Sequence, residues 1–196
     1  MGEYMKKDKN KDLNIIKQAA KIYKENLLNK NIMFVYLKNN KIEFYTVTFL
    51  EEHFKHLTGV KTKLDAYTFF YKASNNRLRI NDFDYKDNTT ALKLNNLVKA
   101  MMINSYAKMI GEFNHNRTYL SVDKMIGNNN LIIGYDSGEK INYPKTILKG
   151  DIREYINQKP CRIIGIMRKK ISDKRYGEIM YLGKNIKLED IWKNEE

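Results

Sequence analysis

Thr48–Lys61 reads TFLEEHFKHLTGVK and predicts a short helix with a defined start and end. Thr48, with Glu51 three residues later, is a capping-box pattern, in which two side chains bind the first free amides of a helix. Gly59 is the expected end, because glycine enters the left-handed region without steric cost. The residue spacing separates an apolar face from a charged face. The apolar face holds Phe49, Leu50, Phe54 and Leu57.

Two of the three histidines of the chain lie in this stretch. His53 falls beside the apolar face, where packing is the expected role. His56 falls at the boundary between the faces, so packing can hold its ring while the ring still meets solvent. An imidazole there can act as an acid or a base near neutral pH. The alternative is that both are ordinary boundary histidines.

The whole chain has 196 residues, enough for one domain with its own core. We expect Met1–Lys11 to form a flexible basic arm and residues 12–192 to form a single domain. Cys161 is the only cysteine, which suits a reducing cytosol. The charged N-terminus lacks a signal-peptide pattern, and no apolar run is long enough to span a membrane. We therefore expect a cytoplasmic protein without a membrane partner; the sequence does not indicate an oligomeric state.

The formal net charge of +13 favours a polyanionic partner such as RNA. Lysine accounts for 29 of the 36 basic residues, a bias typical of low-GC genomes, so the location of the charge is more informative than its total. Residues 145–175 hold ten basic and three acidic side chains, a local balance of +7. Arginine presents a fork of donors that matches phosphate, and four of the seven arginines lie there. They are Arg153, Arg162, Arg168 and Arg175.

Helices are expected in the first half of the chain. An apolar stripe from Leu13 to Leu27, capped by Asp12, predicts the first helix. Another is expected over 63–73, capped by Thr62 and Asp65, and a long one over 90–110 that ends at Gly111. In the 63–73 helix, the core side chains would be Tyr67, Phe70 and Tyr71. The alternative for these three rings is a platform on which bases stack.

Strands are expected around and after these helices. The runs at 32–37 and 42–48, separated by Lys38-Asn39-Asn40-Lys41, predict a hairpin. Later runs between turn sequences cover 119–126, 130–135, 140–143, 162–170 and 177–182. We also expect a short helix over 148–156 and a strand or helical turn over 186–192. The order predicts an α+β fold, with N-terminal helices packed on an antiparallel β-sheet.

Several familiar site patterns are absent from the sequence. It contains no P-loop, no GxGxxG and no HExxH. His53 and His56 have no clear third group beyond the neighbouring glutamates to complete a metal site. Cys161 enters an apolar strand, where cysteine is usually inert. We therefore expect no metal and no cofactor.

The remaining polar residue types suit RNA cleavage without a metal. In that reaction the ribose 2′-hydroxyl attacks the adjacent phosphate, which requires a base, an acid and cationic groups. His56 would supply the acid or base. The cations that would stabilise the phosphate are Lys145, Arg168, Lys169 and Lys170. The phosphate oxygens would be positioned by Thr58, Thr146 and Tyr176.

Three motifs resemble a phage and mobile-element family of nuclease-like domains in the barnase–EndoU–colicin–RelE (BECR) superfamily. They are FKHLTGVK, YPKTILKGDI and IIGIMRKKISDKRYGEIMYL. The similarity runs from about Lys30 to Tyr181. It implies helices packed on an antiparallel sheet whose exposed face cuts RNA without a metal. By position, it implies site residues His56, Thr58, Lys145, Thr146, Lys169 and Tyr176.

We therefore expect a metal-independent endoribonuclease that acts on host RNA or on the RNA of a host defence complex. A guide RNA held by a CRISPR effector would be one such target, which would make the protein an anti-CRISPR factor. RNA contacts are expected from Lys61, Arg168, Lys170, Lys174 and Arg175. One alternative is a non-catalytic inhibitor that binds RNA or a ribonucleoprotein. Another is a phage structural accessory protein.

Overall fold

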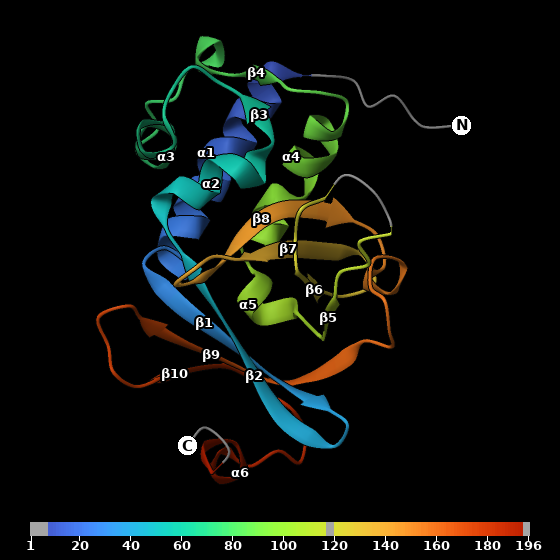
Figure 1. Cartoon of the computed structure of the whole chain (residues 1–196). Helices are drawn as coiled ribbons and strands as arrows, with labels where there is room; N and C mark the ends of the chain where they lie inside the picture. Colours follow the sequence, from blue (N-terminus) through green and yellow to red (C-terminus); the bar gives the residue numbers. More distant parts are fainter. Residues whose placement is uncertain (1–7, 117–119, 194–196) are drawn as a thin grey trace.

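The β1–β2 hairpin is central to the fold, and the computed structural model (Figure 1) describes residues 8–116 and 120–193 around it. β1 (Lys30–Lys38) and β2 (Lys41–Phe49) pair along their whole length. The turn residues Asn39 and Asn40 have φ angles of 51° and 62°. Asn tolerates this left-handed conformation because its short polar side chain can hydrogen-bond locally. The predicted hairpin is therefore confirmed.

Eight strands form one sheet in the order β1-β2-β8-β7-β6-β5-β9-β10. The remaining bounds are β5 (Met109–Glu112), β6 (Lys124–Gly127), β7 (Leu131–Ser137), β8 (Asn142–Lys149), β9 (Cys161–Lys170) and β10 (Glu178–Leu182). β1 also pairs with β9, so seven of the strands close into a ring with β10 attached. The ring is joined between β2 and β8 by a parallel bridge, Val47 to Asn142. The other pairings within the sheet are antiparallel in the part of the chain described, so the expected α+β fold is confirmed.

The helices α1–α4 gather at one end of the sheet (Figure 1). Their bounds are α1 (Lys9–Asn26), α2 (Glu51–Thr58), α3 (Ala66–Ser74) and α4 (Thr89–Ala100). Beside them lie the short strands β3 (Val60–Lys61) and β4 (Asp84–Tyr85) and the 3₁₀ helix η1 (Ile80–Asp82). Later elements are α5 (Ile103–Tyr106), η2 (Ile152–Glu154) and α6 (Leu188–Trp192). No helix within residues 8–116 and 120–193 is long and apolar enough to cross a membrane.

Tyr23 of α1 fixes the place where β2 turns into α2. It is fully buried, and its ring meets those of Phe49, Phe54 and Phe70 edge-on, with centroids 6.0, 5.3 and 5.6 Å away. Its hydroxyl donates to the carbonyl oxygen of Leu50 at 2.7 Å. Edge-on aromatic pairs add to the stabilisation from burial. The start of α2, which carries both histidines, is therefore held by the main core.

Helix starts differ from the sequence prediction. α1 begins at Lys9 and is capped by Asp8, not Asp12, so Lys9–Lys11 are helical and residues 1–7 of the expected arm lie outside the described residues. Thr48 does not cap α2, because it lies in β2 and donates to Asn31 Oδ1 at 2.8 Å. α3 begins at Ala66, where the Asp65 side chain accepts from the Thr68 amide. A capping pattern in the sequence thus marked the region of a helix start but not its residue.

Two of the three aromatic side chains expected in the core from α3 are exposed. Tyr67 is 62% exposed and Tyr71 is 46% exposed, whereas Phe70 is buried as predicted. Phe69 and Ala73 complete the buried face with Phe70, because this is the side of α3 that packs against α1 and α2.

The long helix expected over 90–110 is wrong in its second half. α4 ends at Ala100, α5 adds a separate turn, and Met109 and Ile110 belong to β5. Gly111 lies inside β5, where an added Cβ would lie 2.8 Å from Ile156 Cδ1. The apolar spacing continued through the break because α5 and β5 are also buried.

The later segments agree with the prediction only in part. Pro144-Lys145-Thr146 lies inside β8, not after a strand. The expected helix over 148–156 is reduced to the single turn of η2. The 186–192 segment takes the helical alternative, as α6. Tyr119, in the expected 119–126 strand, lies outside the described residues, and β6 covers only its end.

Candidate active site

His56 reaches the surface at the end of α2, where α2 meets β8. The helix starts with the Leu50 amide donating to His53 Nδ1 at 3.1 Å. It ends at Gly59, which has a φ of 67° and needs the conformational freedom of glycine. The predicted helix end is confirmed, and the two fixed ends determine where His53 and His56 point.

His53 is a packing residue, as predicted. It is 5% exposed, and its ring stacks on Tyr143 with centroids 5.2 Å apart and an interplanar angle of 18°. Burial, with a further contribution from the charge of His56, lowers its pKa to about 4. His53 is therefore neutral at neutral pH, which suits its role as a hydrogen-bond acceptor inside the helix start.

His56 is exposed and lies within electrostatic range of Lys145. Partial burial lowers its pKa first, and the positive charges of Lys55 and Lys145 lower it further, against the opposing effect of Glu52. A lowered pKa keeps the imidazole neutral near pH 7. His56 can therefore accept a proton from a bound molecule.

Lys145 is held on β8 by an ion pair with Asp136 on β7. Tyr143 donates to the same Asp136 oxygen at 3.2 Å. Burial alone would raise the pKa of Asp136, but its hydrogen bond with Lys145 and the positive charge of Lys145 lower it below the usual value. Asp136 thus stays ionised and orients the ammonium group. We call His56, Asp136, Tyr143 and Lys145 the His56 cluster.

A second group lies where the end of β9 and the β9–β10 turn meet the hairpin. Lys169 Nζ sits 4.8 Å from the centre of the Tyr176 ring and donates to the Lys174 carbonyl at 3.2 Å. The Tyr176 hydroxyl lies 3.2 Å from Thr46 Oγ1 on β2. We call Thr46, Lys169 and Tyr176 the Tyr176 cluster.

The junction of β2 and β8 links the two clusters. Asn142 Nδ2 donates to the Thr46 carbonyl at 2.9 Å, and Asn142 precedes Tyr143 on β8. Strand β8 therefore carries residues of the His56 cluster and, at Asn142, a hydrogen bond to Thr46 of the Tyr176 cluster. A cation is present in each cluster, and a neutral imidazole is present in the first.

A comparison with protein families matches residues 15–185 to the family described as phage-Barnase-EndoU-ColicinE5/D-RelE like nuclease4. The match includes both clusters and most of the chain. The chain belongs to this family. The membership supports a nuclease-like function and an α+β fold of BECR type. No curated protein and no solved structure matches the chain.

Thr58 and Thr146 were predicted to contact phosphate. The structure contradicts both predictions, because both side chains are buried. Thr58 is fully buried, and its hydroxyl donates to the Lys55 carbonyl at 2.7 Å, inside the end of α2. Thr146 is 5% exposed, and its hydroxyl is buried. A Cβ built on Gly134 would lie 3.0 Å from the Thr146 methyl group. Both threonines therefore pack against neighbouring backbone and do not reach solvent.

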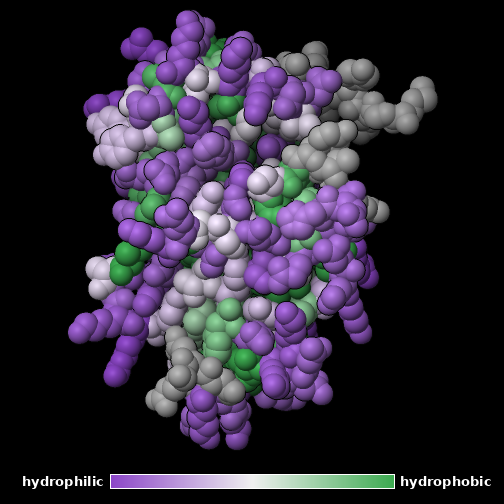
Figure 2. All heavy atoms as spheres, in the orientation of Figure 1, coloured by the Kyte–Doolittle hydropathy of each residue, from purple (hydrophilic) through white to green (hydrophobic). Residues whose placement is uncertain are grey.

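The residues predicted to contact RNA do not form one surface. The guanidinium group of Arg168 already has partners, because it forms an ion pair with Glu178 and donates to the Asn26 carbonyl at 3.0 Å. Lys170, Lys174 and Arg175 are exposed at the β9–β10 turn. Lys61, on β3, lies among the helices and away from that turn (Figure 1). Hydrophilic side chains cover most of the face shown in Figure 2, so charge alone does not single out an RNA path.

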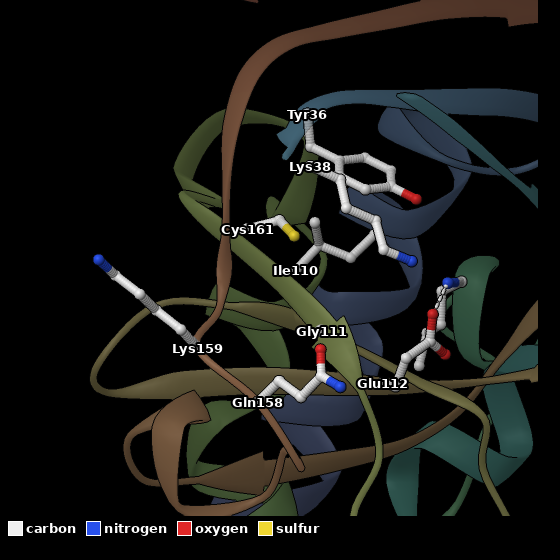
Figure 3. Close-up of a pocket in the computed structure, with 9 residues that line it drawn as sticks. Tyr36, Lys38, Ile110, Gly111, Glu112, Gln158, Lys159 and Cys161 are labelled. Carbon is white, nitrogen blue, oxygen red and sulfur yellow. Dashed lines mark hydrogen bonds and ion pairs between the residues drawn. The ribbon is translucent and has the colours of Figure 1, made fainter. Parts of the chain in front are cut away.

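A separate pocket lies near the start of β9 (Figure 3), away from both clusters of this nuclease-like domain. Its lining includes Tyr36, Glu112, Lys124 and Cys161. The pocket has a volume of about 40 Å³, far below the roughly 300 Å³ of a typical ligand site. Cys161 is half-buried there and lies in neither cluster.

The residues 8–116 and 120–193 contain no group of three His, Cys, Asp or Glu side chains placed to hold a metal ion. His56, Lys145, Lys169 and Tyr176 were named from the sequence, and the structure adds Asp136, which pairs with Lys145. The β7–β8 register places Asp136 opposite Tyr143, and this pairing is set by the fold.

Proposed function

We propose that this protein is a metal-independent endoribonuclease of phage or mobile-element origin that cleaves RNA of the host or of a host defence system. The observation that carries the proposal is His56, an exposed imidazole with a lowered pKa beside Lys145, in a chain of a nuclease-like family. A neutral imidazole next to a fixed cation suits proton removal from a ribose hydroxyl beside a phosphate.

In the proposed reaction, His56 takes the proton of the 2′-hydroxyl. The 2′-oxygen forms a bond to phosphorus, and the bond from phosphorus to the 5′-oxygen breaks. Lys145 stabilises the added negative charge on the phosphate oxygens, while Asp136 holds its ammonium group in place. Lys169, in the Tyr176 cluster, stabilises the negative charge that develops on the departing 5′-oxygen and donates a proton to it. The products are a 2′,3′-cyclic phosphate and a 5′-hydroxyl.

One observation favours a second candidate, a non-catalytic RNA-binding inhibitor. Lys145 is already paired with Asp136, which reduces the positive charge available to a phosphate. Such a protein would occupy RNA or a ribonucleoprotein through the same surface without breaking a bond.

Incubation of the purified protein with total RNA and EDTA tests the proposal. We expect cleavage that survives EDTA, leaves 2′,3′-cyclic phosphate ends and falls at least about 100-fold in His56→Ala, the scale of a lost general base. Lys145→Ala should reduce cleavage similarly, because it removes the cation. His115→Ala is the matched control, since His115 is exposed, packs edge-on against Phe113 and lies in neither cluster.

Other outcomes would favour other functions. Intact RNA that shifts on a gel would support the inhibitor. Intact RNA with no shift at low salt would contradict both candidates and leave a structural role.

A further inference from the structure

A polar groove lies beside the β2–β8 junction, between the two clusters. It has a volume of about 310 Å³, within the range of small-molecule sites. Its walls are Asn31, Thr46 and Thr48 on the hairpin and residues 138–142 at the β7–β8 turn. Unlike the pocket of Figure 3, it is large enough for a nucleobase.

Neighbouring strands place two residues of the hairpin wall in one row with Lys169. Asn31 is the direct partner of Lys169 on β9 and of Thr48 on β2. Directly opposed residues of antiparallel strands point to the same face of a sheet. The row therefore runs from Lys169 of the Tyr176 cluster into the groove, and the opposite wall holds Asn142, which directly precedes Tyr143 of the His56 cluster in β8.

The hydrogen bonds of the two amide side chains fix which groups face the groove. Asn31 Oδ1 accepts from Thr48 Oγ1 at 2.8 Å, so its Nδ2 is left as a donor. Asn142 Nδ2 donates to the Thr46 carbonyl at 2.9 Å, so its Oδ1 is left as an acceptor. Within residues 8–116 and 120–193, neither Asn31 Nδ2 nor Asn142 Oδ1 has a partner.

We propose that this groove binds one nucleobase of single-stranded RNA, read by the Asn31 donor and the Asn142 acceptor, and so sets the base preference of the site. The inference rests on the proposed ribonuclease function, because it places the base next to the phosphate held between the two clusters. Every base carries a hydrogen-bond acceptor next to a donor on one of its edges. Amide side chains can donate to that acceptor and accept from that donor. Discrimination arises because a mismatched edge leaves buried polar atoms without partners.

Binding of short RNAs that cannot be cleaved tests this inference separately from catalysis. The probes are four five-nucleotide homopolymers of A, C, G and U with 2′-O-methyl groups, which block the attacking hydroxyl. We expect the wild-type protein to bind one base at least about tenfold more tightly than the weakest. Asn31→Asp replaces the donor by an acceptor yet can still accept from Thr48, and it should abolish this preference.

Asn96→Asp is the matched control. It makes the same change of charge on α4, where Asn96 donates to the Leu92 carbonyl outside the groove. It should weaken binding of all four probes equally and keep the preference. A preference that disappears in Asn31→Asp alone supports the inference, even if natural RNA is not cut and the nuclease proposal fails. Equal binding of the four probes, no binding, or a preference unchanged by Asn31→Asp would overturn it, even if RNA is cleaved.

Discussion

At the scale of single residues, partial burial lowers the pKa of His56, and the surrounding charges change it further. Lys145 lowers its pKa and Glu52 raises it. We therefore expect Lys145→Gln to raise the pKa of His56 and Glu52→Gln to lower it further. Proton NMR titration can measure both changes, because a chain with three histidines gives few ring signals. The ring signal of His115 serves as the internal reference. An unchanged titration of His56 in Lys145→Gln would show that the two side chains do not interact.

His53 makes the stability of the protein depend on pH. Its pKa is about 4 in the folded protein and 6.5 as the ordinary value, so the unfolded chain binds the proton more tightly. The contribution of neutral His53 is therefore complete above pH 6.5 and is lost as the pH falls toward 4. Between pH 7.5 and 5, we expect the wild type to lose about 2 kcal/mol more unfolding free energy than His53→Gln. Gln keeps an acceptor at this helix position and does not titrate. Urea unfolding at the two pH values measures the difference, and equal losses would contradict the assignment.

At the scale of elements, Gly59 is the residue on which the end of α2 depends. Its φ of 67° is unfavourable for other residues, and an added Cβ would lie 2.7 Å from Lys93 Cδ. We expect Gly59→Ala to lower the unfolding free energy by about 1–2 kcal/mol. Gly177→Ala is the control, because no atom lies within 4 Å of its added Cβ, and it should change stability by less than about 0.5 kcal/mol. Similar thermal unfolding of the two variants would contradict this account of the helix end.

Local signals allowed the hairpin and the end of α2 to be predicted, because Asn39, Asn40 and Gly59 act through their own backbone. Long-range pairing could not be predicted in the same way. Met109 and Ile110 fit a helical pattern, but they are strand residues because β6 and β9 pair with them.

The same limit applies to the site. The resemblance identified the motifs with His56 and Lys145, and the fold places Lys145 where its charge lowers the pKa of His56. The sequence did not show that Thr58 and Thr146 are buried, since burial depends on the elements packed around them.

At the scale of the whole molecule, the net charge is +13. Some of the basic side chains are paired with carboxylates, and others are exposed to a partner. Arg168 is occupied by Glu178, whereas Lys174 and Arg175 are exposed beside the Tyr176 cluster. We expect Lys174→Gln and Arg175→Gln each to reduce the salt dependence of RNA binding by about one unit of slope. Arg168→Gln should leave that slope unchanged and reduce stability. Binding measured from 50 to 300 mM salt distinguishes these results, and an equal effect of Arg168→Gln would show that its ion pair opens to phosphate.

The pairing of β1 with β9 has a consequence for how the protein is made. Lys30 pairs with Lys170, so β1, which is synthesised early, can pair with β9 only after most of the chain has been synthesised. On the ribosome, the hairpin and α2 therefore emerge with one side of β1 open, and Lys169 and Tyr176 are not yet beside Thr46. Such distant contacts form slowly, because the intervening chain must first be ordered. A growing chain thus carries His56 before the Tyr176 cluster has formed, so the proposed site is completed only after the β9–β10 turn has left the ribosome.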